Sequence, residues 1–380
     1  MLRSFILSLF LIYFNFCFAQ SPLGGWTYYG SYNNMEVLEV VGDQVYVGND
    51  QGAFFVTNTS INETKKLTKV DGFVDSKVTY LRYSEIEKIL VIAYTNGQID
   101  LLKGNQILNV NDIFRNENIN TSKRINHITI RGKVAYLSTD FGVVVLDITT
   151  GLIKEAYRYI GQNGNQVEVY SSSIKNKTDS LFIVTEEGVQ TASLLNYNLQ
   201  DFHNWTLHNG SNQLPTETLV DVSTLNDTVY LASVVGLYTL ESNLWVNKLA
   251  VSNPIKSMTE EKQNLFFCFS DTVATIHSSE NIKFSTSSSI TNGAMARADK
   301  NGVVYLADEV NSLVKLSTNQ SYVPSGPFYS DAFRIKYFDK KITVLSGAYR
   351  NYNSPSGLTK GYYEYSTLTW ANYLSGVDIP

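Results

Sequence analysis

Residues 134–147 read VAYLSTDFGVVVLD, in which two apolar runs flank a short polar turn that ends at Gly142. This pattern is typical of a β-hairpin, because a tight turn between two strands favours a glycine that tolerates positive φ. The same unit recurs around Gly52, Gly97, Gly188 and Gly236, and the five glycines are separated by 45, 45, 46 and 48 residues. So regular an interval predicts a chain built from copies of one small β unit.

A repeat of this length predicts a β-propeller. One small sheet cannot bury both of its faces, so units of roughly 40 to 50 residues pack side by side around an axis. The second copy is the clearest, with strand-like runs at Val78–Tyr83, Ile89–Tyr94, Gln98–Lys103 and Gln106–Val110. The many tyrosines and phenylalanines suit half-buried strands. The sequence therefore predicts an all-β fold, a seven-bladed β-propeller of four-stranded antiparallel blades.

The later copies of the unit are weaker. Near Asp271 and Asn311 the glycine is missing, with Thr272 and Asn311 in its region, so we expect looser turns there. We also expect the sixth and seventh blades to lack a good fourth strand. A strand near the N-terminus often completes the last blade of such a ring, and the segment around Trp26 is the candidate for this role.

One domain boundary is predicted. The run Pro324-Ser325-Gly326-Pro327 resists both helix and central strand. Residues 20–325 are therefore predicted to form the N-terminal propeller. Residues 326–380 contain one more copy of the unit, which we interpret as the first blade of a second, truncated propeller. The alternative is a single eight-bladed ring.

The N-terminus predicts export. Arg3 is followed by an apolar segment from Phe5 to Phe14 and by small residues up to Ala19, so residues 1–19 are predicted to be a signal peptide. A retained membrane anchor is the weaker alternative, because the apolar part is shorter than the ~20 residues that span a bilayer. We expect a protein at the cell surface or outer membrane, with the periplasm as the alternative.

Charge excludes one class of partner. The net charge is -5 and no run of lysine or arginine occurs, which argues against binding to a nucleic-acid backbone. We expect no nucleic-acid partner.

The histidines and the cysteine predict no reactive site. His127, His203, His208 and His277 are scattered over three blades, and we interpret them as satisfied or exposed imidazoles rather than metal ligands. Cys268, the one cysteine that remains after signal cleavage, lies in an apolar strand and is predicted to be a buried core side chain.

The acidic residues do not predict catalysis either. Glycosidases need two carboxylates that converge on one bond, whereas the adjacent residues of Glu186-Glu187 and of Glu260-Glu261 diverge on a strand. The turn at residues 138–142 matches part of an Asp box, the hairpin turn of sialidase-like propellers, and predicts a turn stabilised by its Asp side chain.

Calcium is the remaining candidate. Asn49-Asp50 and Asp299 offer oxygen donors in turns, but no calcium-loop motif surrounds them. The sequence therefore predicts no catalytic, metal-binding or cofactor-binding residue, no cofactor and no enzymatic activity.

Polar loops between the blades are the remaining candidates for recognition. Propellers bind ligands through their rims and axial funnel, where residues of all blades converge. The connectors rich in polar residues, glycine and asparagine are Lys69–Lys77, Asn116–Lys123, Gly161–Gln166 and Asn209–Glu217. We expect them to form an interaction rim, and no individual ligand-binding residue is predicted.

Long segments of the chain resemble the N-terminal propeller of the PorZ family, surface proteins of the type IX secretion system of Bacteroidetes. The likeness rests on GGWTYYGSYNN, KVTYLRYSE, VIAYTNGQIDLL, NVNDIF and INHITIRGKVAYLSTDFGVVVLD, and it spans residues 20 to 380. The resemblance implies a non-enzymatic role in which the protein binds anionic lipopolysaccharide and presents it to a sortase. It also implies outer-membrane secretion components as partners.

Two further functions stay open. The connectors LTKVDGFVDSKVTYL and WTLHNGSNQLPTETLVDV resemble those of regulator-type propellers in Bacteroidetes surface sensors, which would make the chain the sensor domain of a hybrid two-component regulator. A solute- or glycan-binding propeller that serves a transporter is the other alternative.

Overall fold

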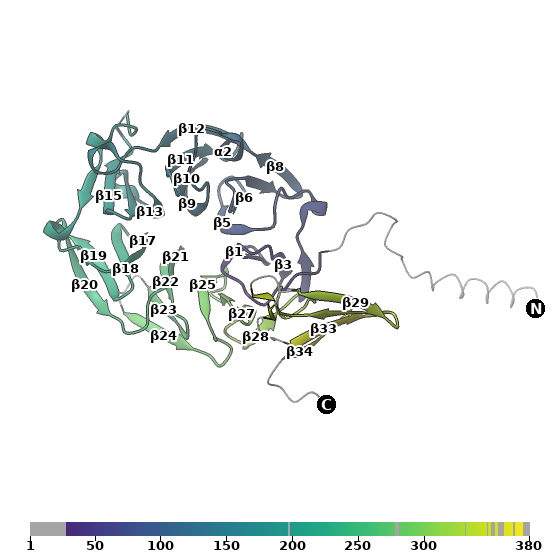
Figure 1. Cartoon of the computed structure of the whole chain (residues 1–380). Coiled ribbons are helices and arrows are strands. Elements are labelled where there is room, and N and C mark those ends of the chain that lie inside the picture. Colours follow the sequence, from purple (N-terminus) through teal and green to yellow (C-terminus); the bar gives the residue numbers. More distant parts are fainter. Residues whose placement is uncertain are drawn as a thin grey trace, which may run out of the picture.

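The computed structural model describes residues 28–196, 198–277, 281–330, 332–347, 349–350, 354–355, 361–367 and 369–374. The predicted signal peptide and Trp26 lie outside the described residues. In the described part, seven four-stranded sheets form a ring and an eighth four-stranded sheet lies beside it (Figure 1). The fold is therefore all-β, as the sequence predicts.

Each blade of the ring is an antiparallel meander of four consecutive strands. Blade 1 has β1 (Val37–Val41), β2 (Gln44–Gly48), β3 (Phe54–Asn58) and β4 (Glu63–Lys66), and blade 2 has β5 (Val78–Ser84), β6 (Ile89–Tyr94), β7 (Ile99–Lys103) and β8 (Gln106–Val110). Blade 3 has β9 (Ile125–Arg131), β10 (Val134–Thr139), β11 (Gly142–Asp147) and β12 (Leu152–Tyr157), and blade 4 has β13 (Val169–Lys175), β14 (Ser180–Thr185), β15 (Gly188–Ser193) and β16 (Thr206–His208).

The remaining blades follow the same order. Blade 5 has β17 (Leu219–Leu225), β18 (Thr228–Ser233), β19 (Gly236–Glu241) and β20 (Leu244–Ala250), and blade 6 has β21 (Ser257–Glu261), β22 (Asn264–Cys268), β23 (Thr272–His277) and β24 (Ile282–Thr286). Blade 7 has β25 (Gly293–Ala298), β26 (Val304–Asp308), β27 (Ser312–Lys315) and β28 (Gln320–Tyr322).

Short helical turns occupy the connections. They are η2 (Lys69–Asp71), α2 (Asp112–Arg115), η3 (Gln162–Gly164), η4 (Asn176–Thr178), η5 (Phe202–Asn204) and η6 (Gly210–Asn212). No helix in the described part is both long enough and apolar enough to cross a bilayer.

The ring closes between blades 7 and 1. The first strands of consecutive blades contact one another around the axis, and β1 contacts both β5 and β25. Two backbone hydrogen bonds join the ends of the ring: Met35 N–H donates to the Asp308 carbonyl at 3.1 Å, and Ser312 N–H donates to the Asn33 carbonyl at 2.8 Å. The seven-bladed ring is confirmed, and the alternative of a single eight-bladed ring is wrong.

One expectation about the later blades is also wrong. Blades 6 and 7 each have a fourth strand, β24 and β28. Residues of these strands are mostly exposed, because the fourth strand forms the outer edge of a blade. Their sequences therefore lack the apolar alternation by which a strand is recognised.

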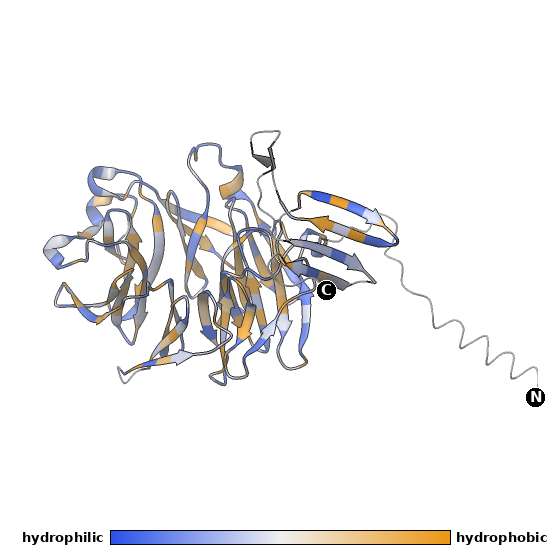
Figure 2. Ribbon diagram, turned by 60° about the horizontal axis from the view of Figure 1, so that its bottom comes forward, coloured by the Kyte–Doolittle hydropathy of each residue, from blue (hydrophilic) through white to orange (hydrophobic). Residues whose placement is uncertain are grey.

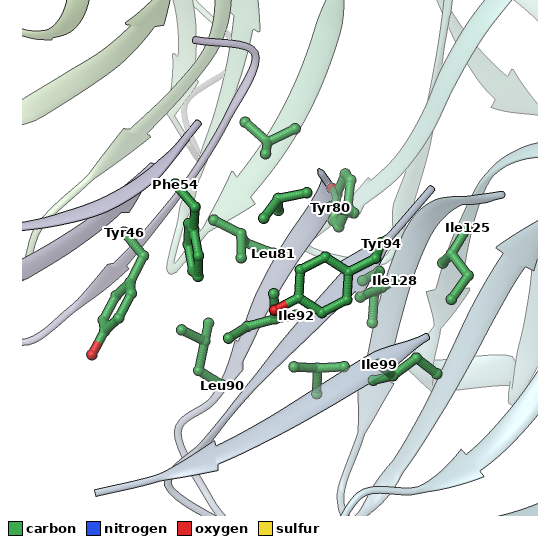
Figure 3. Close-up of a cluster of buried hydrophobic side chains, with 14 of the residues drawn as sticks. Tyr46, Phe54, Tyr80, Leu81, Leu90, Ile92, Tyr94, Ile99, Ile125 and Ile128 are labelled. Atoms are coloured by element: carbon green, nitrogen blue, oxygen red, sulfur yellow. The ribbon is translucent and has the colours of Figure 1, made fainter. Parts of the chain in front are cut away.

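The core lies between the blades. Apolar segments fall mainly within the strands of the ring, and hydrophilic segments fall mainly in the loops (Figure 2). Figure 3 shows how side chains of three consecutive blades pack together. The labelled members of this cluster are Tyr46 and Phe54 of blade 1; Tyr80, Leu81, Leu90, Ile92, Tyr94 and Ile99 of blade 2; and Ile125 and Ile128 of blade 3.

The eighth sheet has the order β29 (Arg334–Phe338), β30 (Lys341–Leu345), β33 (Gly361–Ser366) and β34 (Thr369–Leu374), with a small pair formed by β31 (Tyr349–Arg350) and β32 (Ser354–Pro355). Tyr29 joins this sheet to the ring, because its ring packs on Tyr365 and Trp370 and its hydroxyl lies 3.1 Å from that of Tyr365. The sheet projects from the side of the ring (Figures 1 and 2). That it begins a second propeller stays a prediction, as do the boundaries of the domains.

Candidate functional site: the axial channel

The first strands of the blades surround a channel along the axis. It contains three consecutive cavities, which we call upper, middle and lower, with volumes of about 510, 100 and 230 Å³. Tyr80 and His127 line both the upper and the middle cavity, and Arg82 and Glu260 line both the middle and the lower one. The upper cavity lies at the end where each first strand begins, and the lower cavity lies at the end where each first strand stops.

All seven blades contribute to the wall of the upper cavity. In blades 2, 3, 4, 5 and 7 the pairing of the first strand with the second shifts by one residue near its start, which is a β-bulge. The residues left without a partner in these registers are Thr79, Asn126, Tyr170, Val220 and Ala294, and every one of them lines the upper cavity. A bulge turns one extra side chain out of the alternation of a strand. The repeated bulge is therefore the local feature that builds this wall.

Blades 1 and 6 have no such bulge and contribute charged residues instead. Glu36 precedes β1, and Lys256 precedes β21. Lys256 Nζ lies 2.9 Å from Glu309 Oε1 and donates to Asn292 Oδ1 at 2.7 Å. Burial, together with the nearby Asp50 carboxylate, raises the pKa of Glu36. Carboxylates therefore outnumber cations in the upper cavity, and its one lysine is already paired.

A narrow polar zone separates the upper from the middle cavity. The rings of Tyr80 and His127 lie 4.5 Å apart between their centroids. Burial, assisted by the positive charges of Arg82 and Arg297, lowers the pKa of His127 to about 3, so the imidazole is neutral.

Asp221 lies in the same zone. Its carboxylate accepts a hydrogen bond from the Ser171 hydroxyl and another, at 2.8 Å, from Met258 N–H. Burial raises the pKa of Asp221 to about 6, because the charged form loses more hydration than these hydrogen bonds return.

A buried guanidinium lies beside the middle cavity. Arg297 is 1% exposed, and its Nη2 lies 3.4 Å from Glu39 Oε2 while its Nη1 lies 3.7 Å from Glu261 Oε2. Its Nε donates to the Leu38 carbonyl at 3.1 Å. Burial raises the pKa of Glu39 although Arg297 opposes the shift. This cluster connects blades 7, 1 and 6.

A fourth cavity, of about 490 Å³, lies on the rim beside the upper cavity. It is bounded by the turn of residues 185–188 and by the connector Asn209–Glu217, and Tyr170 lines both cavities. This connector and the other three predicted ones lead into the first strands β5, β9, β13 and β17, so all four approach the channel from its upper end. Their role as an interaction rim stays a prediction.

The histidine interpretation is correct for two residues and wrong for two. His203 and His277 are exposed, and their Nδ1 atoms lie 2.8 Å from Asp201 and 2.9 Å from Asn264. The Nδ1 atoms of His127 and His208 are buried and have no hydrogen-bond partner among the described residues. His208 packs on Trp245 and Phe182 between blades. The spacing of the four histidines along the chain did not reveal that the Nδ1 atoms of these two would be buried without a hydrogen-bond partner.

The prediction for Cys268 is confirmed, and the one for the Asp-box turn is wrong. Cys268 is fully buried, and burial raises the pKa of its thiol. In the turn, the Thr139 hydroxyl accepts from Phe141 N–H and donates to the Gly142 carbonyl. Asp140 instead accepts from Asn126 across the strand pair. The Thr139 hydroxyl lies at the end of β10, where it reaches both Phe141 N–H and the Gly142 carbonyl, and therefore stabilises the turn.

The two residues of the acidic pair Glu186-Glu187 diverge, as expected. Glu186 accepts from Glu168 N–H, whereas Glu187 accepts from Gln162 N–H. Glu260 and Glu261 both line the lower cavity; Glu260 also lines the middle one, and Glu261 approaches Arg297. That this second pair diverges stays a prediction.

The calcium candidates are already engaged by other groups of the protein. Asn49 Oδ1 accepts three backbone N–H groups, Asp50 pairs with Arg124 at 2.9 Å, and Asp299 accepts two backbone N–H groups. Among the described residues, no group of three histidine, cysteine or acidic side chains is close enough to hold a metal ion.

Comparisons with known proteins give the same fold. Residues 45–206 match the family model described as TSS9, PorZ, N-terminal beta-propeller domain. One solved structure is that of PorZ, an essential bacterial surface component of the type IX secretion system of Porphyromonas gingivalis. It is 20% identical to this chain with a TM-score of 0.76, and the match covers 91% of this chain and 46% of that one. The extracellular domain assigned to a hybrid two-component system of B. thetaiotaomicron is 12% identical with a TM-score of 0.57, covering 90% of this chain and 47% of that one. This chain thus spans about half the length of both structures. Among curated proteins, none matches it.

Proposed function

Because this chain is a PorZ-like β-propeller, we propose that it is an exported, non-enzymatic binding protein of a type IX secretion system. It acts at the cell surface or outer membrane, where it binds envelope lipopolysaccharide and presents it to a sortase and to outer-membrane secretion components. The observation that supports this proposal most is the family-model match over residues 45–206, together with the structural match that covers 91% of the chain.

The channel supports a binding role on independent grounds. Propellers use the axis and one rim for recognition, and here every blade places a side chain in the upper cavity. Glu186 and Glu187 diverge, and the thiol of Cys268 is buried, so neither supplies the convergent groups that hydrolysis requires.

The test is affinity isolation from solubilised cell envelope with the tagged full-length protein. Recovery of lipopolysaccharide together with a sortase and an outer-membrane β-barrel is the expected result. Recovery of a transporter permease or a histidine kinase, or of no envelope component, would overturn the proposal. An unrelated exported propeller with the same tag serves as the control for nonspecific capture of lipopolysaccharide.

A further inference from the structure

The upper cavity has hydrogen-bonding capacity that the described residues do not use. The Thr79 hydroxyl and the His127 Nδ1 atom are both buried, both residues line the cavity, and neither atom has a hydrogen-bond partner among the described residues. Thr79 is 5% exposed. Buried polar groups are almost always paired, and an unpaired one costs free energy. A polar ligand that reaches these two buried atoms from the cavity would supply the missing partners.

The bulged residues give one side of the cavity a distinct chemistry. Thr79, Asn126 and Tyr170 come from the consecutive blades 2, 3 and 4, and they place a hydroxyl, an amide and an aromatic ring along one arc. The Asn126 Nδ2 group already donates to Asp140 Oδ1 and to the Val169 carbonyl, so a ligand would use the Asn126 carbonyl oxygen as an acceptor. Hydroxyl and amide groups bind the hydroxyls of a sugar, and a tyrosine ring offers an apolar face with a polar edge for its C–H groups. These three residues therefore suit a sugar ring, which has polar hydroxyls around its edge and apolar C–H groups on its faces.

The negatively charged side chains of the upper cavity disfavour anionic ligands. Glu36, Asp221 and Glu309 line the cavity, and the opposing cation, Lys256, is bound to Glu309 and Asn292. A phosphate or carboxylate would meet three carboxylates and one lysine in a partly desolvated site, where like charges repel strongly. The volume of about 510 Å³ lies within the range of small-molecule sites.

We propose that the upper cavity binds an uncharged, hydroxyl-rich sugar unit along the arc formed by Thr79, Asn126 and Tyr170. This site rests on the proposed function, since such a sugar unit is part of an envelope glycan. It adds that this cavity takes only the uncharged part of the glycan. The anionic groups of the glycan stay outside this cavity, and the neutral sugar enters it.

The experiment uses the full chain and matched sugars. Saturation-transfer NMR measures binding of glucose, galactose, mannose and N-acetylglucosamine, and of glucose 6-phosphate and glucuronate as anionic counterparts. At least one neutral sugar should bind, and both anionic sugars should bind about tenfold more weakly than it does. Equal or tighter binding of the anionic sugars, or no binding of any neutral sugar, would overturn the proposal.

Two variants locate the site. Thr79→Val keeps the shape of the side chain and removes only the unpartnered hydroxyl, so the thermal midpoint should not fall, while affinity for the neutral sugar should fall about tenfold. Tyr170→Leu should also weaken binding. Thr228→Val on β18, which does not line the cavity, is the matched control and should bind as the unmodified protein does. Undiminished binding by both cavity variants would contradict the proposed site.

The outcome is distinguishable from failure of the proposed function. If the unmodified protein captures lipopolysaccharide and its secretion partners but the cavity variants bind neutral sugar unchanged, the cavity proposal fails and the secretion role stands. If neutral sugar binds in the cavity but no secretion partner is recovered, the secretion role fails and the sugar site stands.

Discussion

Gly142 is needed for two reasons that act at one residue. Its φ is +122°, a conformation that L side chains rarely adopt, and a Cβ there would collide with the Tyr157 carbonyl oxygen. A tight turn explains only the first of these. The second arises because the end of β12, at Tyr157, pairs beside the start of β11, so Gly142 is also a packing residue.

Gly142→Ala should therefore lower the free energy of unfolding by roughly 3 kcal/mol, since strained backbone and backbone contact add. Gly132→Ala is the control, because Gly132 has a φ of +58° but a Cβ at this position would meet no atom within 4 Å. It should cost only about 1 to 2 kcal/mol. Urea unfolding measures both, and equal losses would mean that the contact with Tyr157 contributes nothing.

Asp221 and His127 affect stability in opposite directions as pH changes. The pKa of Asp221 is about 6 in the folded protein and 3.8 ordinarily, so the folded state holds an extra proton between these values and stability falls as pH rises through them. The pKa of His127 is about 3 in the folded protein and 6.5 ordinarily, so the unfolded state holds the extra proton and stability falls as pH drops from 6.5. The two effects oppose each other between about pH 4 and 6.

Single substitutions should separate them. Relative to the unmodified protein, Asp221→Asn should lose stability on acidification from pH 6 to 4, because only the histidine effect remains. His127→Gln should gain stability over the same interval. Each difference should approach about 1.4 kcal/mol per pH unit in urea unfolding at pH 4, 5 and 6. Profiles parallel to that of the unmodified protein would show that neither group is perturbed by burial.

At the level of elements, strand burial decides what the sequence reveals. β6 is buried along its whole length and reads as an unbroken apolar run, so the second blade is recognised at once. β24 is mostly exposed and reads IKFST, which carries no periodic signal. The inner strands of a blade are therefore easier to predict from sequence, whereas an exposed outer strand such as β24 is found only by its pairing.

The exposed strand β29 makes a prediction about association. Every residue of β29 is exposed, including Ile335 at 65% and Tyr337 at 70%, and the strand forms one edge of its sheet. A free edge with apolar side chains is a template for pairing with other chains. Ile335→Lys combined with Tyr337→Lys should reduce concentration-dependent association in light scattering.

The same double variant should change the free energy of unfolding by no more than about 0.5 kcal/mol, because both side chains are exposed. A matched pair of lysines at the exposed Ile61 and Ile86 controls for the added charge. If that pair reduces association as strongly, net charge and not the β29 edge is responsible.

At the scale of the molecule, the period of the glycines predicts the ring, but not what the ring brings together. Thr79, Asn126 and Tyr170 are more than forty residues apart along the chain, and only closure places them around one cavity. The bulges that place them in the wall of this cavity leave no mark in a single sequence. The nearest signal is the presence of hydroxyl and amide residues at the starts of otherwise apolar first strands, as in the Ser171 region of β13.

Ring closure also depends on a buried charge, and this can be tested. Arg297 of blade 7 contacts Glu39 and the Leu38 carbonyl of blade 1, where both charged side chains are almost fully buried. Arg297→Met leaves the Glu39 carboxylate without its partner and should cost about 3 to 5 kcal/mol in urea unfolding. Adding Glu39→Met should restore most of the loss, since the orphaned charge is then gone. Arg131→Met, which breaks the more exposed pair with Asp179, should cost less than about 1 kcal/mol. A loss for Arg297→Met as small as that for Arg131→Met would mean that the two ends of the ring are held by their backbone hydrogen bonds and apolar packing alone.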